Sequence, residues 1–393
     1  MDKNEPRIFT PFFYLSVMGL FAIFSSTMSK SPTLTLFAIS LGASDPEIGL
    51  IAAASTIPGI VASLPFGFLS DVYGRRKVIL FSSLLFALSP FLYFLVQTPL
   101  HLALVRLVHG FATAIFGPVS VALVADIFQS RRGEKMAVFS SVTLVGRLMA
   151  PFMGGVLLTL TNSSFQTVYF VCGISGLLAL SAAIMVKPKN AIAVSTRTRN
   201  LRMIIKEGLS EILGDNRILV VSGVEAAQLF AYGAVEAFIP KYCSQVLALP
   251  DWQIGAILAL EVAALMLTKP AMGRLSDKVG RRLPIIAGLL LGVLSLFSIF
   301  LVRDGLTLTL VLVLFGIGMA AVTASTSPLV ADLSKEKSYG SAMGLLDTIM
   351  DVGQTLGPIA FGLLLPIFYY YVSFALVGLL LLAFSFIFAA AVR

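Results

Sequence analysis

The side chains best suited to chemistry in this sequence are charged residues that lie inside long apolar segments. An isolated carboxylate in apolar surroundings suits reversible protonation, and a charge at such a position usually faces a cavity or a partner. The residues of this kind are Lys30, Arg106, His109, Arg147, Glu225, Glu236, Glu261, Lys269, Asp347 and Asp351. They predict the binding of protons or of a charged solute inside the protein.

Three of the carboxylates allow two interpretations. Glu225, Glu236 and Glu261 can each bind a proton, or each can be neutralised by a cation elsewhere in the chain or lie near the water interface. The cations that qualify as partners are Arg106, Arg147 and Lys269. The sequence does not decide between the two.

Motifs for enzymatic chemistry are absent from the sequence. It contains neither a zinc-binding HExxH helix, nor a phosphate-binding P-loop, nor a nucleophile elbow. The histidines, His101 and His109, do not complete a catalytic triad, and Cys172 and Cys243 lie in apolar surroundings without metal-ligand spacing. The sequence therefore predicts no enzyme, no cofactor and no metal site.

Membrane-spanning helices are the elements that must position these charges. A mean hydropathy of +0.95 over 393 residues gives more apolar surface than a soluble core can bury. A span needs about 20 helical residues, because hydrocarbon leaves no partner for free backbone amides. Apolar segments of this length lie at 10–40, 48–70, 78–98, 100–125, 136–160, 166–187, 216–247, 252–275, 283–303, 306–332, 340–364 and 368–392. The sequence thus predicts an all-α membrane protein with twelve transmembrane helices.

Basic residues are concentrated in loops that lie on one side of the membrane if the twelve helices alternate. Most of the 28 Lys and Arg residues follow the second, fourth, eighth and tenth helices or fill the middle loop. The positive-inside rule assigns this side, with both termini, to the cytoplasm of a multi-pass protein of the cell membrane. The net charge of +8 then reflects topology and contact with anionic lipids, and nucleic acid is not an expected partner.

A polar, basic stretch at 188–215 divides the chain. It is predicted to be a cytoplasmic linker between one six-helix bundle at 1–187 and another at 216–393. The two parts repeat each other, since GFLSDVYGRR at 67–76 matches GRLSDKVGRR at 273–282 with an offset of 206, and later matches keep an offset of 206 or 207. Parallel repeats of this kind place a substrate site between the bundles near the bilayer midplane.

The repeated loop resembles the signature of the major facilitator superfamily, whose members are transporters built from two parallel six-helix repeats. A helix 4 motif of that family is also met, by Arg106-x-x-x-Gly110. The resemblance implies that the loop is a cytoplasmic latch that favours the outward-open state. The latch residues would be Gly67, Asp71, Gly74, Arg75 and Asp126, with Gly273, Asp277, Gly280, Arg281 and Asp332 in the second copy.

Physical chemistry gives each residue of the first loop a task. Gly67 permits the close approach of a neighbouring helix, and Gly74 permits a tight turn. Asp71 can accept hydrogen bonds from the free amides at the N-terminus of a neighbouring helix, and Arg75 is placed to pair with Asp126. If the loop served only to fix the topology of the chain in the membrane, its basic residues would be explained. The aspartate and the glycine that recur in both copies would not be.

Small residues at a spacing of four, beside a proline, occur on the segment 136–160 and again on 340–364. The first copy resembles the helix 5 motif of proton-coupled drug antiporters. The second copy favours an alternative, in which both are packing stripes related by the repeat. The residues expected to take part in conformational change from these two helices are Gly154, Pro151 and Pro358.

The distribution of charge predicts which helices enclose a cavity. Four segments contain no ionisable residue and are expected to face lipid: 78–98, 166–186, 283–302 and 368–392. On 216–247, Glu225, Tyr232 and Glu236 lie on one line at about 100° per residue. Two other polar lines consist of Arg106, Gly110, Thr113 and Gly117, and of Asp347, Asp351 and Gln354.

These features predict a secondary active transporter that moves a small organic solute by alternating access. Proton-coupled export of a drug-like compound or metabolite is the leading hypothesis, and a proton symporter or uniporter for an organic anion or sugar is the alternative. The acidic lines favour cationic lipophilic compounds, whereas Lys30, Arg106 and Arg147 suit an organic anion or sugar acid. The expected partners are the small-molecule substrate, protons and membrane lipids, and the chain is expected to act as a monomer.

Topology provides the first test. We expect a reporter fused within 190–210 to give a cytoplasmic signal and one inserted at 162–165 to give the opposite signal, because the two loops lie on opposite sides of an alternating twelve-helix chain. Paired phosphatase and fluorescent-protein fusions measure this. Matching signals from both positions would contradict the layout.

Overall fold

The computed structural model describes residues 5–128, 132–186, 214–334 and 339–392, together with positions 203, 206 and 210. Every regular element in these residues is a helix. The longer ones are α1 (Glu5–Met28), α2 (Thr33–Ser40), α3 (Asp45–Ala54), α4 (Ile57–Tyr73), α5 (Arg75–Leu92), α6 (Pro99–Ile127), α7 (Arg132–Leu160), α8 (Phe165–Met185), α10 (Asn216–Gln245), α11 (Asp251–Val279), α12 (Arg282–Ser298), α13 (Gly305–Leu333) and α14 (Tyr339–Ala391). The linker predicted at 188–215 lies almost wholly outside the described residues.

Eleven segments of the described chain are long and apolar enough to cross a membrane. The last, Met343–Ala391, is 49 residues long, and its backbone leaves the helical conformation at Tyr369, where φ is 56°. Since a crossing needs about 20 residues, this segment contains two spans. The predicted all-α fold with twelve transmembrane helices is confirmed.

Two of the predicted helices are broken inside the membrane. The segment 10–40 forms α1 and α2, and 48–70 falls within α3 and α4. Each second part begins at a proline, Pro32 or Pro58, which lacks the amide that a continuous helix needs. At the second break the hydroxyls of Ser55 and Thr56 donate to backbone carbonyls of the preceding turn, which satisfies those groups without water.

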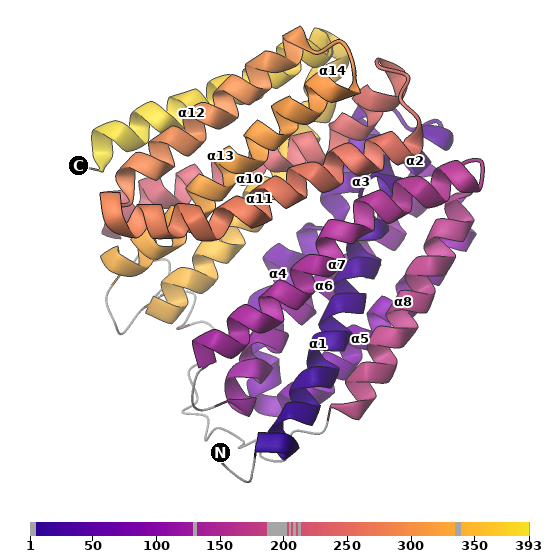
Figure 1. Cartoon of the computed structure of the whole chain (residues 1–393), viewed down its shortest axis with the longest axis vertical. Helices are drawn as coiled ribbons and strands as arrows, with labels where there is room; N and C mark the ends of the chain where they lie inside the picture. The colour runs from indigo at the N-terminus through magenta and orange to yellow at the C-terminus, as the bar shows by residue number, and fades with distance from the viewer. Residues whose placement is uncertain are drawn as a thin grey trace.

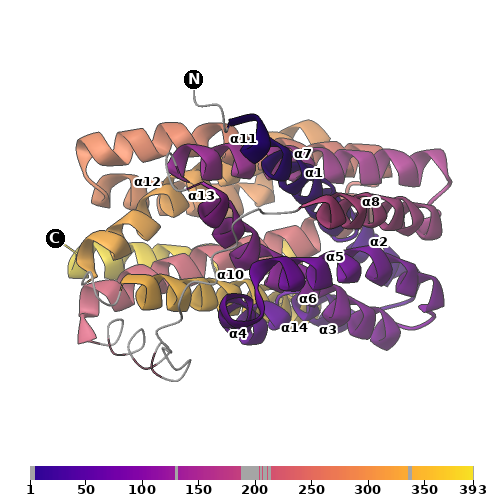
Figure 2. The same ribbon diagram turned by 90° about the horizontal axis from the view of Figure 1, so that it is seen from below.

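The helices form two groups, which we call the N half (α1 to α8) and the C half (α10 to α14). Figure 1 shows the halves converging near α2 and α3 and diverging toward the chain termini. Figure 2 shows α7 beside α11, and α4 near α14, where the halves meet. We call the end that carries residues 41–44, 161–164 and 246–250 the closed end, and the opposite end the open end.

Equivalent residues of the two halves make equivalent contacts. Gly146 on α7 packs against the carbonyl oxygen of Leu20, and Gly353 on α14 packs against that of Ala226, so closely that a side chain at either glycine would overlap the oxygen. The residues of the two contacts correspond at the repeat offset, since Ala226 lies 206 residues after Leu20 and Gly353 lies 207 residues after Gly146. The parallel repeats predicted from the sequence are therefore present, and both small-residue stripes serve helix packing.

Glycines also join the two halves at the closed end. In each contact a glycine of one half meets a backbone carbonyl of the other. The contacts join Gly155 with Asp251, Gly362 with Asp45, Gly255 with Pro151, and Gly49 with Pro358. Pro151 and Pro358 thus belong to one symmetric joint, whereas Gly154 faces Met28 and Thr33 of its own half.

The outer helices are α5, α8, α12 and the last part of α14. They expose large apolar side chains such as Phe170 and Leu294. None of the residues that line the central cavity described below comes from these helices. This arrangement agrees with the prediction that they face lipid.

The glycine joint leads to a test of how the closed end is held. A methyl group at Gly255 would meet Gly155 Cα at 3.1 Å and also the Pro151 oxygen. We therefore expect Gly255→Ala to push α7 and α11 apart and to lengthen the distance between spin labels at Leu95 and Leu301, which are exposed, equivalent positions at this end. Double electron–electron resonance measures that distance.

The matched control is Gly133→Ala, because a Cβ at Gly133 meets nothing within 4 Å. An unchanged distance distribution in Gly255→Ala would show that the joint does not hold the halves together.

Candidate functional site

A cavity of about 490 Å³ lies between the two halves. The glycine joint closes it at one end. Its exposed lining residues Thr113, Gly117 and Pro118 lie toward the open end, from which solvent reaches the cavity. The volume suits a small organic solute.

The walls of the cavity carry opposite charges. The N half supplies the cations Lys30, Arg106 and Arg147. The carboxylates come from the C half, from Glu225, Glu236, Glu261 and Asp351, together with the single cation Lys269. Tyr232 lies in the lining between Glu225 and Glu236, as predicted for this face of α10.

Asp347 is the exception among the predicted cavity residues. It is exposed and is not among the residues that line the cavity. Asp347 lies one turn closer to the open end than Asp351, and its part in proton or solute binding stays a prediction. Gln354, on the other side of Asp351, does line the cavity.

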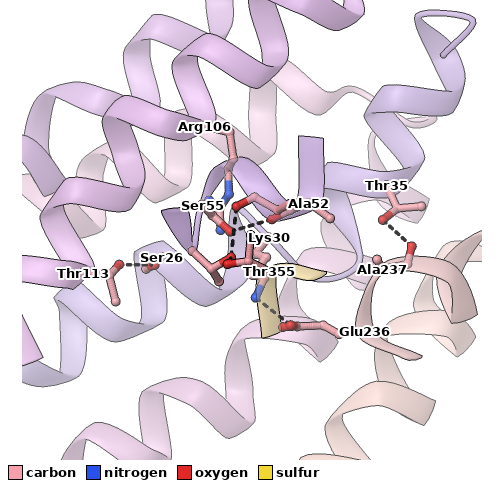
Figure 3. A network of polar contacts seen from close by, with 12 residues as sticks. Ser26, Lys30, Thr35, Ala52, Ser55, Arg106, Thr113, Glu236, Ala237 and Thr355 are labelled. Carbon is pink, nitrogen blue, oxygen red and sulfur yellow. Dashed lines mark hydrogen bonds and ion pairs between the residues drawn. The ribbon is translucent and has the colours of Figure 1, made fainter. Parts of the chain in front are cut away.

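One ion pair joins the two charged walls. Lys30 Nζ lies 2.6 Å from Glu236 Oε2, and the side chains are only 19% and 14% exposed (Figure 3). The residues are 206 positions apart, so they occupy equivalent places in the two repeats. Equivalent positions meet only at the axis that relates the halves. The sequence analysis missed Lys30 as the partner of Glu236, although the repeat offset was the signal that could have found it.

Further interactions join the halves nearer the closed end. Lys241 of α10 pairs with Asp45 of α3. Thr35 of α2 donates a hydrogen bond of 2.9 Å to the carbonyl oxygen of Ala237, also drawn in Figure 3. These contacts, together with the Lys30–Glu236 pair, must break before the closed end can open.

Arg106 is buried among neutral groups of its own half. It is 3% exposed, and its Nη1 donates to Ser29 Oγ at 3.1 Å and to the Tyr93 hydroxyl at 3.4 Å. The Tyr93 ring stacks on Tyr169 with centroids 3.8 Å apart, and its hydroxyl lies 3.4 Å from His109 Nδ1. Arg106 Nε has no partner within the described chain. Tyr93 and Ser29, which fix this guanidinium, come from distant segments and could not be found from local sequence patterns.

The carboxylates of the C half differ in their surroundings. Glu225 is fully buried and accepts a hydrogen bond from the Thr326 hydroxyl, while its Oε1 has no partner in the described residues. Glu261 is 4% exposed, and its side chain forms neither a hydrogen bond nor an ion pair with the described residues. Asp351 reaches across to α4, where its carboxylate lies against Gly59.

Each repeated loop forms an ion-pair cluster at the open end. Arg75 pairs with Asp126, as predicted, and with Asp71 at 2.8 Å, and it donates to Ser70 Oγ at 3.1 Å. The second copy has the same composition. Arg281 pairs with Asp277 and, at 3.5 Å, with Asp332, and donates to Ser276 Oγ at 3.3 Å. Each cluster joins residues of one half.

The loop glycines and Asp71 agree only in part with expectation. Gly74 and Gly280 have φ of 92° and 87°, so both form the predicted tight turns. The close helix approach predicted at Gly67 is absent, since the nearest atom to a Cβ there is 3.9 Å away, and Gly273 is equally open. Asp71 binds Arg75 instead of helix-terminal amides. Both expectations are wrong for this conformation because the halves diverge at the open end.

Comparison with known proteins matches the family model described as Major Facilitator Superfamily to residues 15–265 and 253–393. A protein of Methanocaldococcus jannaschii described as an uncharacterized MFS-type transporter is 29% identical over 345 residues, which cover 86% of each chain. The multidrug resistance protein MdtG of Dickeya zeae is 24% identical over 370 residues, covering 91% of this chain and 89% of that protein.

Solved structures show the same fold at low identity. A mutant of the nucleoside transporter NupG superposes with a TM-score of 0.84 at 13% identity, covering 98% of this chain and all of that one. A bacterial homolog of the human lysosomal transporter Spinster, in an inward-facing and unoccupied conformation, gives 0.80 at 15% identity over 100% of this chain and 96% of that one.

The two loop clusters should differ in their contribution to stability. The aspartates beside Arg75 are 39% and 32% exposed, whereas those beside Arg281 are 64% and 61% exposed and more strongly screened by solvent. We expect Arg75→Gln to lower the free energy of unfolding by about 1 kcal/mol and Arg281→Gln by less. Thermal unfolding followed with a dye that reacts with the buried thiols of Cys172 and Cys243 measures both, and an equal or reversed order would contradict the ranking.

Proposed function

This protein belongs to the major facilitator superfamily, and from that premise we propose that it exports a small organic solute in exchange for protons. Family membership makes it a multi-pass membrane transporter and not an enzyme. The solute would occupy the cavity between the halves. The observation that carries the proposal is the Lys30–Glu236 ion pair, which joins the two halves inside that cavity.

The direction follows from the predicted topology. The positive-inside rule predicts that the open end faces the cytoplasm, and with that orientation the structure would be an inward-facing state that solute enters from the cytoplasm. The relative named as a multidrug resistance protein supports export as the direction of net transport.

Opening the closed end must separate Lys30 from Glu236, because the two residues belong to different halves. An unpaired carboxylate in apolar surroundings has a higher free energy in its ionised form, and a bound proton offsets this cost. A proton from outside would therefore bind Glu236 in the outward-facing state. When the closed end re-forms, the Lys30 ammonium again pairs with Glu236 and displaces the proton toward the cytoplasm.

Exchange also requires that the empty protein does not open with Glu236 ionised. The ion pair would hold the empty inward-facing state, and a solute that competes for Lys30 or Glu236 would release it. Solute leaving and proton entering would then alternate at one site, which is the requirement for antiport.

The loop clusters would control the other end. In the outward-facing state we place Gly67 and Asp71 against the C half, and Gly273 and Asp277 against the N half. Arg75 and Arg281 would keep each loop in shape through their pairs within one half. The open space beside both glycines supports this role, since it leaves room for helix approach.

A second function is favoured by the surroundings of Arg106. This buried cation has no carboxylate partner among the described residues, which suits the import of an organic anion together with protons. The direction of flux under a proton gradient distinguishes import from export.

Protonation should open the closed end. We expect the distance between labels at Leu95 and Leu301 to be longer at pH 5.5 than at pH 8, because in the proposed cycle Glu236 binds a proton only after it has separated from Lys30, so that acid favours the opened state. A second label pair at Lys77 and Leu283, equivalent exposed positions at the open end, should shorten. Glu236→Gln should lengthen the first distance at both pH values and remove the pH response.

The control for this experiment is Glu225→Gln. Glu225 is bonded to Thr326 within the C half, so the variant should keep the pH response. If wild-type distances ignore pH, or if Glu236→Gln responds like the wild type, proton coupling through this ion pair is refuted.

A further inference from the structure

Arg106 and Glu261 are buried charges of the cavity lining that form no ion pair with the described residues. On the N-half wall, Arg106 donates only to the neutral hydroxyls of Ser29 and Tyr93. On the C-half wall, Glu261 has neither a hydrogen bond nor an ion pair with the described residues. A buried charge without a counter-charge is costly. Each of these groups is therefore suited to a partner of opposite charge that arrives from outside the chain.

The other charges of the cavity lining have different surroundings. Lys30 and Glu236 neutralise each other. Glu225 accepts a hydrogen bond from Thr326, while Arg147 and Lys269 are exposed to the solvent of the cavity. Arg106, Glu225 and Glu261 are thus the buried lining charges that form no ion pair in the described chain, and of the two carboxylates only Glu261 also lacks a hydrogen bond.

The repeat places the two charges at similar depths on opposite walls. Glu261 and Ser55 are equivalent positions, and equivalent glycines pack on their carbonyl oxygens, Gly316 on Glu261 and Gly110 on Ser55. Arg106 is one helical turn from Gly110 on α6, roughly 6 Å at 1.5 Å per residue. Arg106 and Glu261 therefore lie within about one turn of the same level.

The charges themselves do not follow the repeat. The position equivalent to Arg106 is Leu312, and the position equivalent to Glu261 is Ser55. Each charge therefore occurs on one wall only. The cavity is electrically polar across its width, with a positive wall on the N half and a negative wall on the C half.

We propose that the transported solute is a zwitterion whose anionic group binds Arg106 and whose cationic group binds Glu261. The inference rests on the proposed transport of a small organic solute through this cavity. An amphiphilic cation would satisfy Glu261 and leave Arg106 without a counter-charge, and an organic anion would do the reverse. A solute with both charges satisfies both walls, and its cationic end also competes for the neighbouring Glu236.

The test uses three scaffolds of increasing charge separation: phenylalanine, phenylalanylphenylalanine and the phenylalanine tripeptide. Each is measured as the free zwitterion, as the cationic methyl ester and as the anionic N-acetyl form, by calorimetry with the full-length protein in lipid nanodiscs. For at least one scaffold we expect the zwitterion to bind ten-fold or more tightly than both of its derivatives.

The variants assign each end of the ligand. Arg106→Gln should weaken the zwitterion at least ten-fold and change the methyl ester less than three-fold. Glu261→Gln should weaken the zwitterion to a similar degree and leave the N-acetyl form unchanged. Arg303→Gln is the control for loss of a positive charge, because Arg303 lies at the closed end and its guanidinium donates to the nearby carbonyl oxygens of Phe300 and Val302.

A variant that fails to fold does not prevent the test. Tyr93→Phe removes one hydrogen bond that orients Arg106 and should weaken the zwitterion several-fold without changing the ester. Preference for an ester or an N-acetyl form in every scaffold, or the absence of binding by all nine compounds, would overturn the proposal. So would equal weakening of all three forms by each variant.

Failure of the proposed export is recognised separately. A zwitterion that binds with the expected pattern but is not moved by a proton gradient in proteoliposomes would keep this inference and refute proton exchange. An ester that is moved by the gradient while zwitterions do not bind would do the opposite.

Discussion

The ion pair between Lys30 and Glu236 sets the constraint on which the remaining structure depends. The two halves follow one plan, so equivalent positions meet only along the axis that relates the halves. If both positions carried the same ionised side chain, two like charges would lie side by side. The chain instead carries opposite charges at this one pair of positions. Holding them at 2.6 Å requires the halves to stay in contact at the closed end, which the glycine joint permits because its glycines have no side chains to separate the backbones. The cavity then exists as the space left where the halves diverge.

The molecule combines a symmetric backbone with an asymmetric distribution of charge. Glycine contacts, tight turns and loop clusters occur in pairs at the repeat offset. For the lining residues Arg106 and Arg147 the equivalent positions are Leu312 and Gln354, and for Glu261 the equivalent position is Ser55. Backbone contacts follow the plan of the repeat at Gly146 and Gly353, because a side chain at either position would overlap the opposing carbonyl oxygen. The side chains that face the cavity have no such packing constraint, and it is there that the two halves differ chemically.

The features that follow from local pattern were predictable from the sequence, and those that depend on distant contacts were not. Hydropathy identified the twelve spans, and repeated motifs identified the two halves and the pair of Arg75 with Asp126. Charge placement alone identified the cavity side of α10.

The breaks beside Pro32 and Pro58 were missed because both flanking segments are apolar enough to read as one span. The pairing of Glu236 with Lys30 and the hydrogen bond from Arg106 to Ser29 required contacts between segments 77 or more residues apart. Helix periodicity indicated the face of α14 that carries Asp347 but not the depth of that residue, which lies outside the cavity lining.

The loop clusters and the cavity contribute differently to the balance between conformations. Arg75 and Arg281 are each satisfied within one half, so within the described residues neither cluster links the halves in this state. Ion pairs that hold the halves together are found at the closed end and in the cavity, where Lys241 meets Asp45 and Lys30 meets Glu236.

A ligand shifts a conformational equilibrium only through a difference in its interactions with the two states. The Lys30–Glu236 pair lies in the cavity lining. A charged solute or a proton that reaches the cavity therefore interacts directly with a pair that is formed in one state and broken in the other. Binding in the cavity and release of the closed end are therefore controlled by the same charges, and no separate signal along the helices is needed to connect them.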